Sequence, residues 1–190
     1  MKNTVLFLFA FCASASSLSA PFGIEMGMPI EDVDKNASLN DSGKLYDVKP
    51  PKPHSLFELY TIQATKQHGV CASKGISKVI DTSVYGTELK SKYTDLKKAL
   101  SSKYGEPSES FDFLKQGSIW REPNEWMASL LRKERNLVSF WMKNLPDGMT
   151  AITLTTHAIS RNKGVLSLQT EFKNRDQCKK IINQTDNNSL

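Results

Sequence analysis

Two cysteines, Cys71 and Cys178, constrain the fold of this chain more than any other pair of residues, because they lie more than a hundred positions apart. The remaining cysteine, Cys12, falls in an N-terminal segment that we expect to be removed. An even pair of cysteines in an exported protein usually forms a disulfide. Such a bond would tie a central strand to a C-terminal helix. By closing a long loop in the unfolded chain, it would stabilise the fold by at most about 4–5 kcal/mol. The alternative is two buried, unpaired thiols.

The N-terminus has the three parts of a secretory signal. Lys2 precedes an apolar run over residues 5–11, and a tract rich in Ser and Ala follows to Ala20. We therefore predict a signal peptide over residues 1–20, with cleavage after Ala15 or after Ala20 left open. The apolar run is too short to cross a membrane, and the bulky residue before Cys12 argues against a lipid anchor. The expected product is a soluble protein in the periplasm or outside the cell.

Composition narrows the class of protein. The chain has 190 residues, of which 39% are hydrophobic, and its net charge of +5 is spread along the sequence. The hydrophobic fraction excludes a disordered chain. The scattered charge does not form the basic surface of a nucleic-acid-binding protein, and no segment after the N-terminal one has the length of a membrane span. About 170 residues suit one domain. We expect a single α+β domain over residues 21–190, with candidate pseudo-repeats at 21–82 and 83–190.

Hydrophobic periodicity predicts mostly strands and one long helix. Period-two patterns and turn residues favour strands, and the apolar stripe from Leu89 to Leu100 favours a helix that ends before Gly105. The expected strands are 45–48, 56–65, 70–80, 111–120, 137–142, 151–159 and 165–172. A short strand and a short helix are expected within 22–36, and further helices at 87–104, from 122 onward and at 176–185. The resulting fold class is α+β: an antiparallel sheet with helices on one face, built from two tandem helix-plus-three-strand units.

Two short motifs suggest a resemblance. The stretch from Gly27 to Val33, with its acidic pair, and the later Gly105-Glu106-Pro107 are similar to patterns in the SmpA-type outer-membrane assembly lipoproteins and the β-lactamase-inhibitor-protein-like domains. The chain also resembles uncharacterised exported bacterial proteins. The resemblance implies a tandem helix-and-sheet architecture and carries over no binding or catalytic residue.

The sequence lacks the usual signatures of catalysis. It has no Gly-x-Ser-x-Gly, no phosphate-binding loop and no zinc motif, and its three histidines, His54, His68 and His157, are isolated. We predict no catalytic residue, no metal and no cofactor. The leading hypothesis is a non-catalytic accessory, inhibitor or immunity-type protein that binds another envelope protein. The alternative is a small hydrolase whose site joins distant residues such as His157 and Glu171.

Aromatic residues in the second half suggest a binding surface. Trp126 lies on the apolar side of a predicted helix and is expected in the core. Phe140 and Trp141 alternate along a strand, so they point to opposite faces and one of them can be exposed. We predict that Trp120, Arg121 and Trp141 form the candidate partner-binding surface, since binding surfaces favour Trp and Arg.

Overall fold

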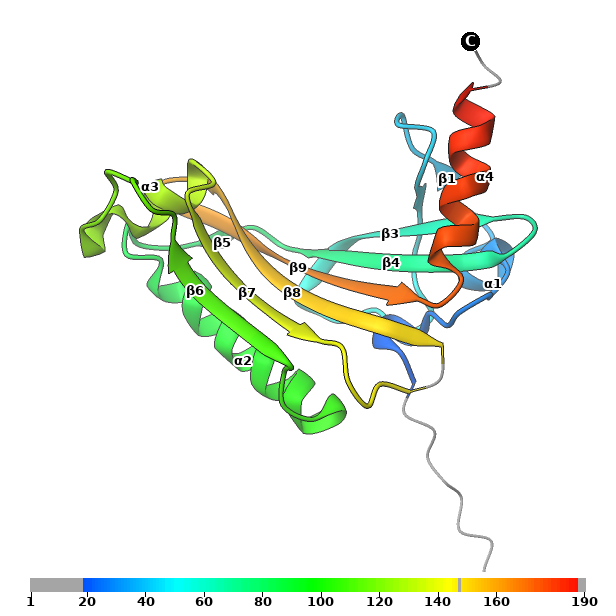
Figure 1. The fold of residues 1–190 in the computed structure, drawn as a ribbon, viewed down its shortest axis with the longest axis horizontal. Helices are drawn as coiled ribbons and strands as arrows, with labels where there is room; N and C mark the ends of the chain where they lie inside the picture. Colours follow the sequence, from blue (N-terminus) through cyan, green and yellow to red (C-terminus); the bar gives the residue numbers. More distant parts are fainter. Residues whose placement is uncertain (1–18, 147, 188–190) are drawn as a thin grey trace, which may run out of the picture.

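The computed structural model describes residues 19–146 and 148–187, which form one open antiparallel sheet with helices packed against it (Figure 1). Residues 1–18 of the predicted signal peptide lie outside the described residues. The strand order is β1-β2-β3-β4-β9-β8-β7-β6, and β5 pairs with β9 beside this path. The α+β class and the antiparallel sheet are therefore confirmed. The strands are β1 (Ser38–Leu39), β2 (Tyr46–Asp47), β3 (Phe57–Thr65), β4 (Gly69–Ser77), β5 (Ile80–Asp81), β6 (Glu109–Leu114), β7 (Arg135–Trp141), β8 (Met149–Ser160) and β9 (Lys163–Phe172).

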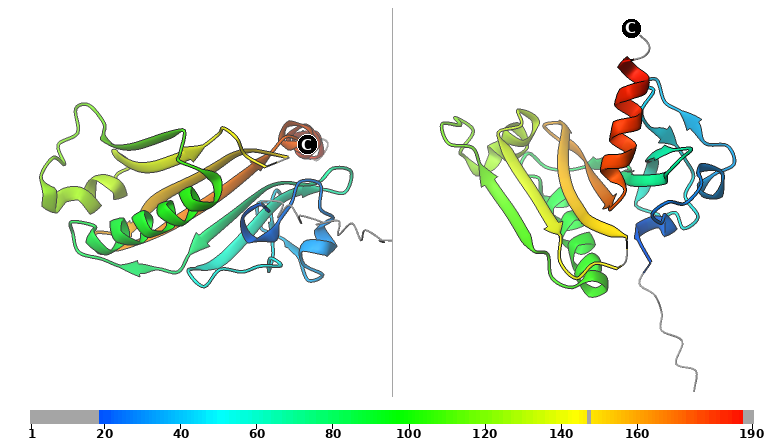
Figure 2. Two further views of the ribbon diagram at one scale, coloured as in Figure 1. Left: turned by 90° about the horizontal axis from the view of Figure 1, so that it is seen from below. Right: turned by 45° about the vertical axis from the view of Figure 1, so that its right-hand side comes forward.

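The helices lie on both sides of this sheet. α2 and α3 pack on one face, whereas α4 stands on the opposite face near the hairpin of β3 and β4 (Figure 2). No helix within residues 19–146 and 148–187 is both long and apolar enough to cross a membrane. The helical segments are η1 (Pro21–Gly23), α1 (Ile30–Val33), α2 (Thr87–Tyr104), η2 (Pro123–Glu125), α3 (Trp126–Leu131) and α4 (Arg175–Asn187).

Strand alternation separates a covered face from an open face. On β8, Ile152 and Leu154 are completely buried, and they belong to the same core cluster as the apolar stripe of α2. Their neighbours Thr153 and Thr155 point the other way and are half-buried. The apolar stripe on α2 thus decides which face of the sheet becomes the core, and the opposite face stays open between β6 and α4.

The start of the folded region differs from the prediction of a short strand. Phe22 has a φ of 63°, which ends any extended run, and a 3-10 turn forms at Pro21–Gly23. Ala20 is buried, and the Ser19 carbonyl accepts a hydrogen bond of 2.9 Å from the Tyr104 hydroxyl. Cleavage after Ala20 would separate these two residues from the fold, whereas cleavage after Ala15 would retain them.

A close approach between Gly86 and Trp126 joins α2 to α3. Gly86 precedes α2 with a φ of +71°, and a Cβ atom there would lie 2.3 Å from the Trp126 ring. The ammonium of Lys90, one turn into α2, lies 4.3 Å from the centre of the same ring. Only glycine combines this backbone conformation with this contact.

We expect Gly86→Ala to lower the free energy of unfolding by about 2–4 kcal/mol, through backbone strain and displacement of the Trp126 ring. Gly117→Ala is the matched control, because Gly117 has a φ of +83° but nothing within 4 Å of the added methyl group. Urea unfolding of both variants separates the cost of backbone strain, which both share, from the cost of displacing the Trp126 ring, which only Gly86→Ala has. Equal destabilisation would show that the Trp126 contact contributes nothing.

Candidate functional site

The structure places Trp141 in the core, which corrects its assignment to a binding surface. Only 1% of Trp141 is exposed, and its indole Nε1 donates to the Gly105 carbonyl at 2.8 Å. This side chain points to the face that α2 covers, so its strand neighbour Phe140 points to the open face. The predicted alternation was right, but the residue chosen as exposed was the wrong one.

Trp120 and Arg121 remain near the surface, in a loop rather than at the end of a strand. β6 stops at Leu114, well before the predicted end at residue 120. Trp120 is half-buried and Arg121 is exposed, and Ser118 orders both: its hydroxyl accepts the Trp120 N–H and its carbonyl accepts the Arg121 Nε–H. Their loop lies beyond the Arg135 end of β7, whereas Trp141 is at the other end, about 20 Å away along the strand. The three residues do not form one surface.

The aromatic surface on the open face consists of Phe111, Phe113 and Phe140. Phe111 and Phe113 are 41% and 45% exposed. The Phe111 ring stands edge-to-face to each of the other two, with centroids 6.3 Å apart in both pairs. We call this set the aromatic cluster. Its signal in the sequence is the alternation of Phe with polar residues in β6, but the sequence does not show that β6 is an edge strand.

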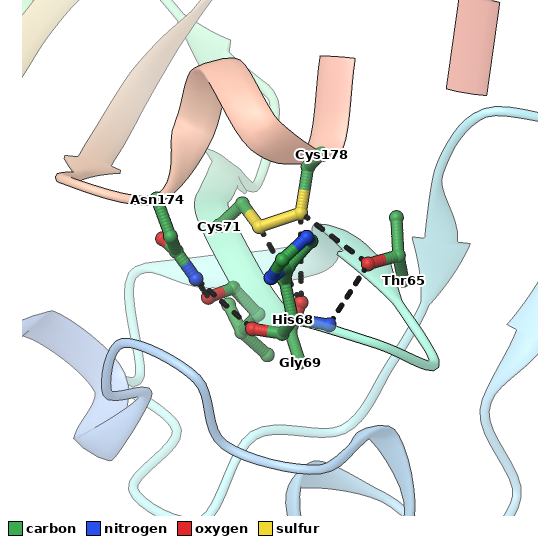
Figure 3. Close-up of a disulfide and its surroundings, with 7 residues drawn as sticks. Thr65, His68, Gly69, Cys71, Asn174 and Cys178 are labelled. Atoms are coloured by element: carbon green, nitrogen blue, oxygen red, sulfur yellow. Dashed lines mark hydrogen bonds between the residues drawn. A yellow bond between two sulfur atoms is a disulfide. The ribbon is translucent and has the colours of Figure 1, made fainter. Parts of the chain in front are cut away.

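The disulfide between Cys71 and Cys178 is present, as predicted, and fixes α4 to β4 (Figure 3). The register of β3 and β4 shifts at this point, so Cys71 is the extra residue of a bulge, a device that can redirect a side chain. The Asn174 amide strengthens the junction by donating to the carbonyls of His68 and Val70, each at 3.0 Å. Cys178 is completely buried, yet the main hydrophobic cluster contains no described residue of α4. The position of α4 therefore depends on this covalent link.

We expect the double variant Cys71→Ala/Cys178→Ala to lose about 2–5 kcal/mol of unfolding free energy, because the unfolded chain is no longer closed into a long loop. Hydrogen exchange should rise strongly across α4 and change little in α2. Reduction of the wild-type protein is the control, and it should reproduce both effects. An α4 that stays protected in the variant would contradict this role of the disulfide.

The residues suggested for a hydrolase do not meet. His157 pairs with Val165 of β9, and Glu171 lies six positions further along that strand, about 20 Å away. The Glu171 carboxylate is already engaged by Arg175 and by the Gln169 amide. A carboxylate this distant cannot orient the His157 ring, so these two residues form no catalytic pair.

A second histidine shares a surface hollow with a carboxylate. His68 and Glu31 line a hollow of about 710 Å³ between α1 and the β3–β4 turn. Within the described part of the chain, no hydrogen bond or ion pair joins their side chains. In the same part of the chain, no three His, Cys, Asp or Glu residues are close enough to hold a metal ion.

Searches against known proteins give no further guidance. No family model, curated protein or solved structure matches this chain. The candidate surface rests on the geometry of the chain itself.

His157 marks the far end of the open face from α4 and carries a perturbed pKa. Its Nε2 lies 3.0 Å from the Ser167 hydroxyl. Desolvation against the sheet lowers the pKa of His157 below its ordinary value of 6.5, and the charges of Lys74 and Lys133 lower it further. The neutral ring therefore stabilises the fold fully above pH 6.5, and this contribution is lost as the pH falls toward the lowered value.

We expect Lys74→Met to raise the pKa of His157 part of the way toward its ordinary value, since one of the two cations is removed and the desolvation remains. NMR titration of the imidazole resonances at low salt measures the shift. Lys78→Met serves as the control, because Lys78 is exposed and is not among the charges acting on this ring. A His157 pKa that does not respond to the loss of Lys74 would contradict this electrostatic map.

Proposed function

We propose that this chain is an exported, non-catalytic protein that binds a protein partner through the open face of its sheet. The aromatic cluster is the observation that carries the proposal. Exposed aromatic side chains grouped on a rigid sheet are typical of binding anchors, because they offer a large contact area at little entropic cost. Scattered exposed apolar residues are ordinary, but three neighbouring rings on an uncovered face, with Phe111 in contact with both of the others, are not.

The rest of the open face suits contact rather than chemistry. The strands between the aromatic cluster and α4 contribute polar, half-buried side chains such as Thr153, Thr155 and Gln169. A polar surround beside an aromatic anchor is the usual anatomy of a transient protein interface. Lys74 lies toward the α4 end, so this part of the surface would favour an acidic region of the partner.

Export is the setting in which we place this function. A disulfide that holds α4 in position fits an oxidising compartment such as the periplasm. The signal peptide at 1–20 and the resemblance to SmpA-type and inhibitor-like modules both stay predictions, and an envelope protein is the partner they imply. The hydrolase alternative has less support, because His157 and Glu171 are far apart. His157 does contact the Ser167 hydroxyl, but Ser167 is only 5% exposed, and among the described residues no carboxylate is hydrogen-bonded to the other ring nitrogen of His157.

We expect cross-linking of the oxidised protein in its own envelope fraction, read by mass spectrometry, to recover one dominant partner protein. The double variant Phe111→Ser/Phe113→Ser should reduce that recovery at least about tenfold, because truncation of an aromatic anchor costs about 2 kcal/mol or more.

Val79→Ser/Tyr85→Ser is the matched control, since these two apolar side chains are similarly exposed, at 49% and 50%, and are not members of the aromatic cluster. Full recovery by the phenylalanine variant would disprove the surface. Absence of any reproducible partner of the wild-type protein would disprove the function.

A further inference from the structure

β6 is a regular edge strand with little to prevent pairing with another chain. It ends the sheet on one side and pairs with β7 through six consecutive residue pairs without a bulge (Figure 1). Its residues are exposed from Glu109 to Phe113. Natural edge strands are usually protected by charged side chains, a proline or a bulge. β6 has no proline and no bulge, and of its two charged residues, Glu109 and Asp112, the Asp112 carboxylate is paired with Arg135. At the opposite edge, β1 has only two residues.

The hydrogen bonds between β6 and β7 determine which main-chain groups of β6 point to the free edge of the sheet. The Lys115 N–H donates to the Glu134 carbonyl at 2.7 Å, in the same register that pairs Leu114 with Arg135. In an antiparallel ladder, successive residues turn their N–H and C=O groups alternately toward the partner strand and away from it. Odd-numbered residues therefore bond β7, and Ser110, Asp112 and Leu114 direct their main-chain groups to the free edge.

These free groups match a second copy of β6 that runs antiparallel. With Asp112 opposite Asp112 of the second copy, Ser110 stands opposite Leu114 of that copy, and about six main-chain hydrogen bonds form. Phe111 then faces Phe113 of the second copy at a non-hydrogen-bonded position, where Cα atoms are about 4.5 Å apart. Cross-strand aromatic pairs stabilise such positions. The two aromatic clusters would become one continuous surface on the open face.

Charge at the centre of this pairing also fits a second copy. The Asp112 carboxylate lies 3.0 Å from the Arg135 guanidinium, and it acts on the ammonium of Lys90 as well. Each copy thus places two cations, Arg135 and Lys90, and the Asp112 carboxylate near the two-fold axis that would relate the two copies. Two opposed Asp112 carboxylates would be surrounded by four cations, which offsets their mutual repulsion. A basic strand of another protein would add a further positive charge to the same place.

We propose that this chain forms a homodimer by antiparallel pairing of β6 with β6 of a second copy. The dimer has one continuous sheet and leaves both open faces accessible. It does not depend on the function proposed above, because self-pairing requires no other protein. A pairing of five β6 residues from each copy is at the small end of stable interfaces, so the dimer is in concentration-dependent equilibrium with the monomer.

Sedimentation equilibrium of the oxidised protein from about 5 to 500 µM, a range suited to small interfaces, is the first test. We expect a reversible dimer for the wild type and for Ser110→Ala. Ser110→Pro should weaken dimerisation at least about tenfold, because proline removes an N–H at the free edge without touching the hydrogen bonds to β7. A wild type that stays monomeric, or a dimer equally strong in Ser110→Pro, would overturn the proposal.

Cysteine cross-linking fixes the register and does not depend on the folding of the proline variant. Asp112→Cys should form an intermolecular disulfide on oxidation at about 1 M salt, which screens the cations of Lys90 and Arg135 that the substitution leaves unpaired, since hydrogen-bonded partners have Cα atoms about 5.5 Å apart. Ser110→Cys is the matched control on the same face and edge, and it should form no intermolecular disulfide because its own counterpart in the dimer is about 13 Å further along the strand. Equal cross-linking of the two variants, or none in Asp112→Cys, would overturn self-pairing and leave β6 available to a strand of another protein.

Discussion

The pairing of β4 with β9 is the interaction on which the rest of this structure depends. Five residue pairs, from Ala72 with Glu171 to Ile76 with Ser167, join the strands β1–β4 to the strands β6–β9. Without this pairing, each set would have an additional exposed edge and only part of a core. With it, the apolar stripe of α2 and the segment around Phe22 cover one continuous face. The other face stays open from β6 to α4.

The covalent link to α4 defines one limit of that open face. α4 brings Cys178 but no described residue of the main hydrophobic cluster, so apolar packing alone does not position it. The disulfide and the Asn174 amide hold its start against β4 and the β3–β4 turn. In an oxidising compartment this arrangement is permanent. The surface available to a partner then lies between α4 and the aromatic cluster.

Local patterns in the sequence were sufficient for some elements and insufficient for others. The helix at 87–104 is confirmed to its ends, because its apolar stripe and the glycine after it are local signals. The disulfide could be predicted from two facts, the expected export to an oxidising compartment and the even number of cysteines left after the signal peptide is removed. The prediction for Trp141 was wrong because strand alternation shows only that Trp141 and Phe140 point to opposite faces. Which of the two faces is covered depends on the packing of α2, which lies far upstream in the sequence. β6 ended early because the chain turns before Gly117, whose φ of +83° is incompatible with a continuing strand.

The exposed cluster itself depends on topology that no short segment encodes. Phe111 and Phe113 would be core residues if another strand or helix covered β6. Their exposure follows from the strand order, in which β6 is last. His157 and Glu171 lie on neighbouring strands, and the register of β8 and β9 places them at opposite ends of the face.

The central claim is that the aromatic cluster is a binding surface, and hydroxyl-radical footprinting tests it most directly. The oxidised protein would be labelled at a concentration at which it is monomeric, with and without its own envelope extract. The account predicts that Phe111, Phe113 and Phe140 lose reactivity in the extract while the exposed Val79 and Tyr85 do not. Unchanged reactivity of the three phenylalanines, or protection confined to another face, would contradict it.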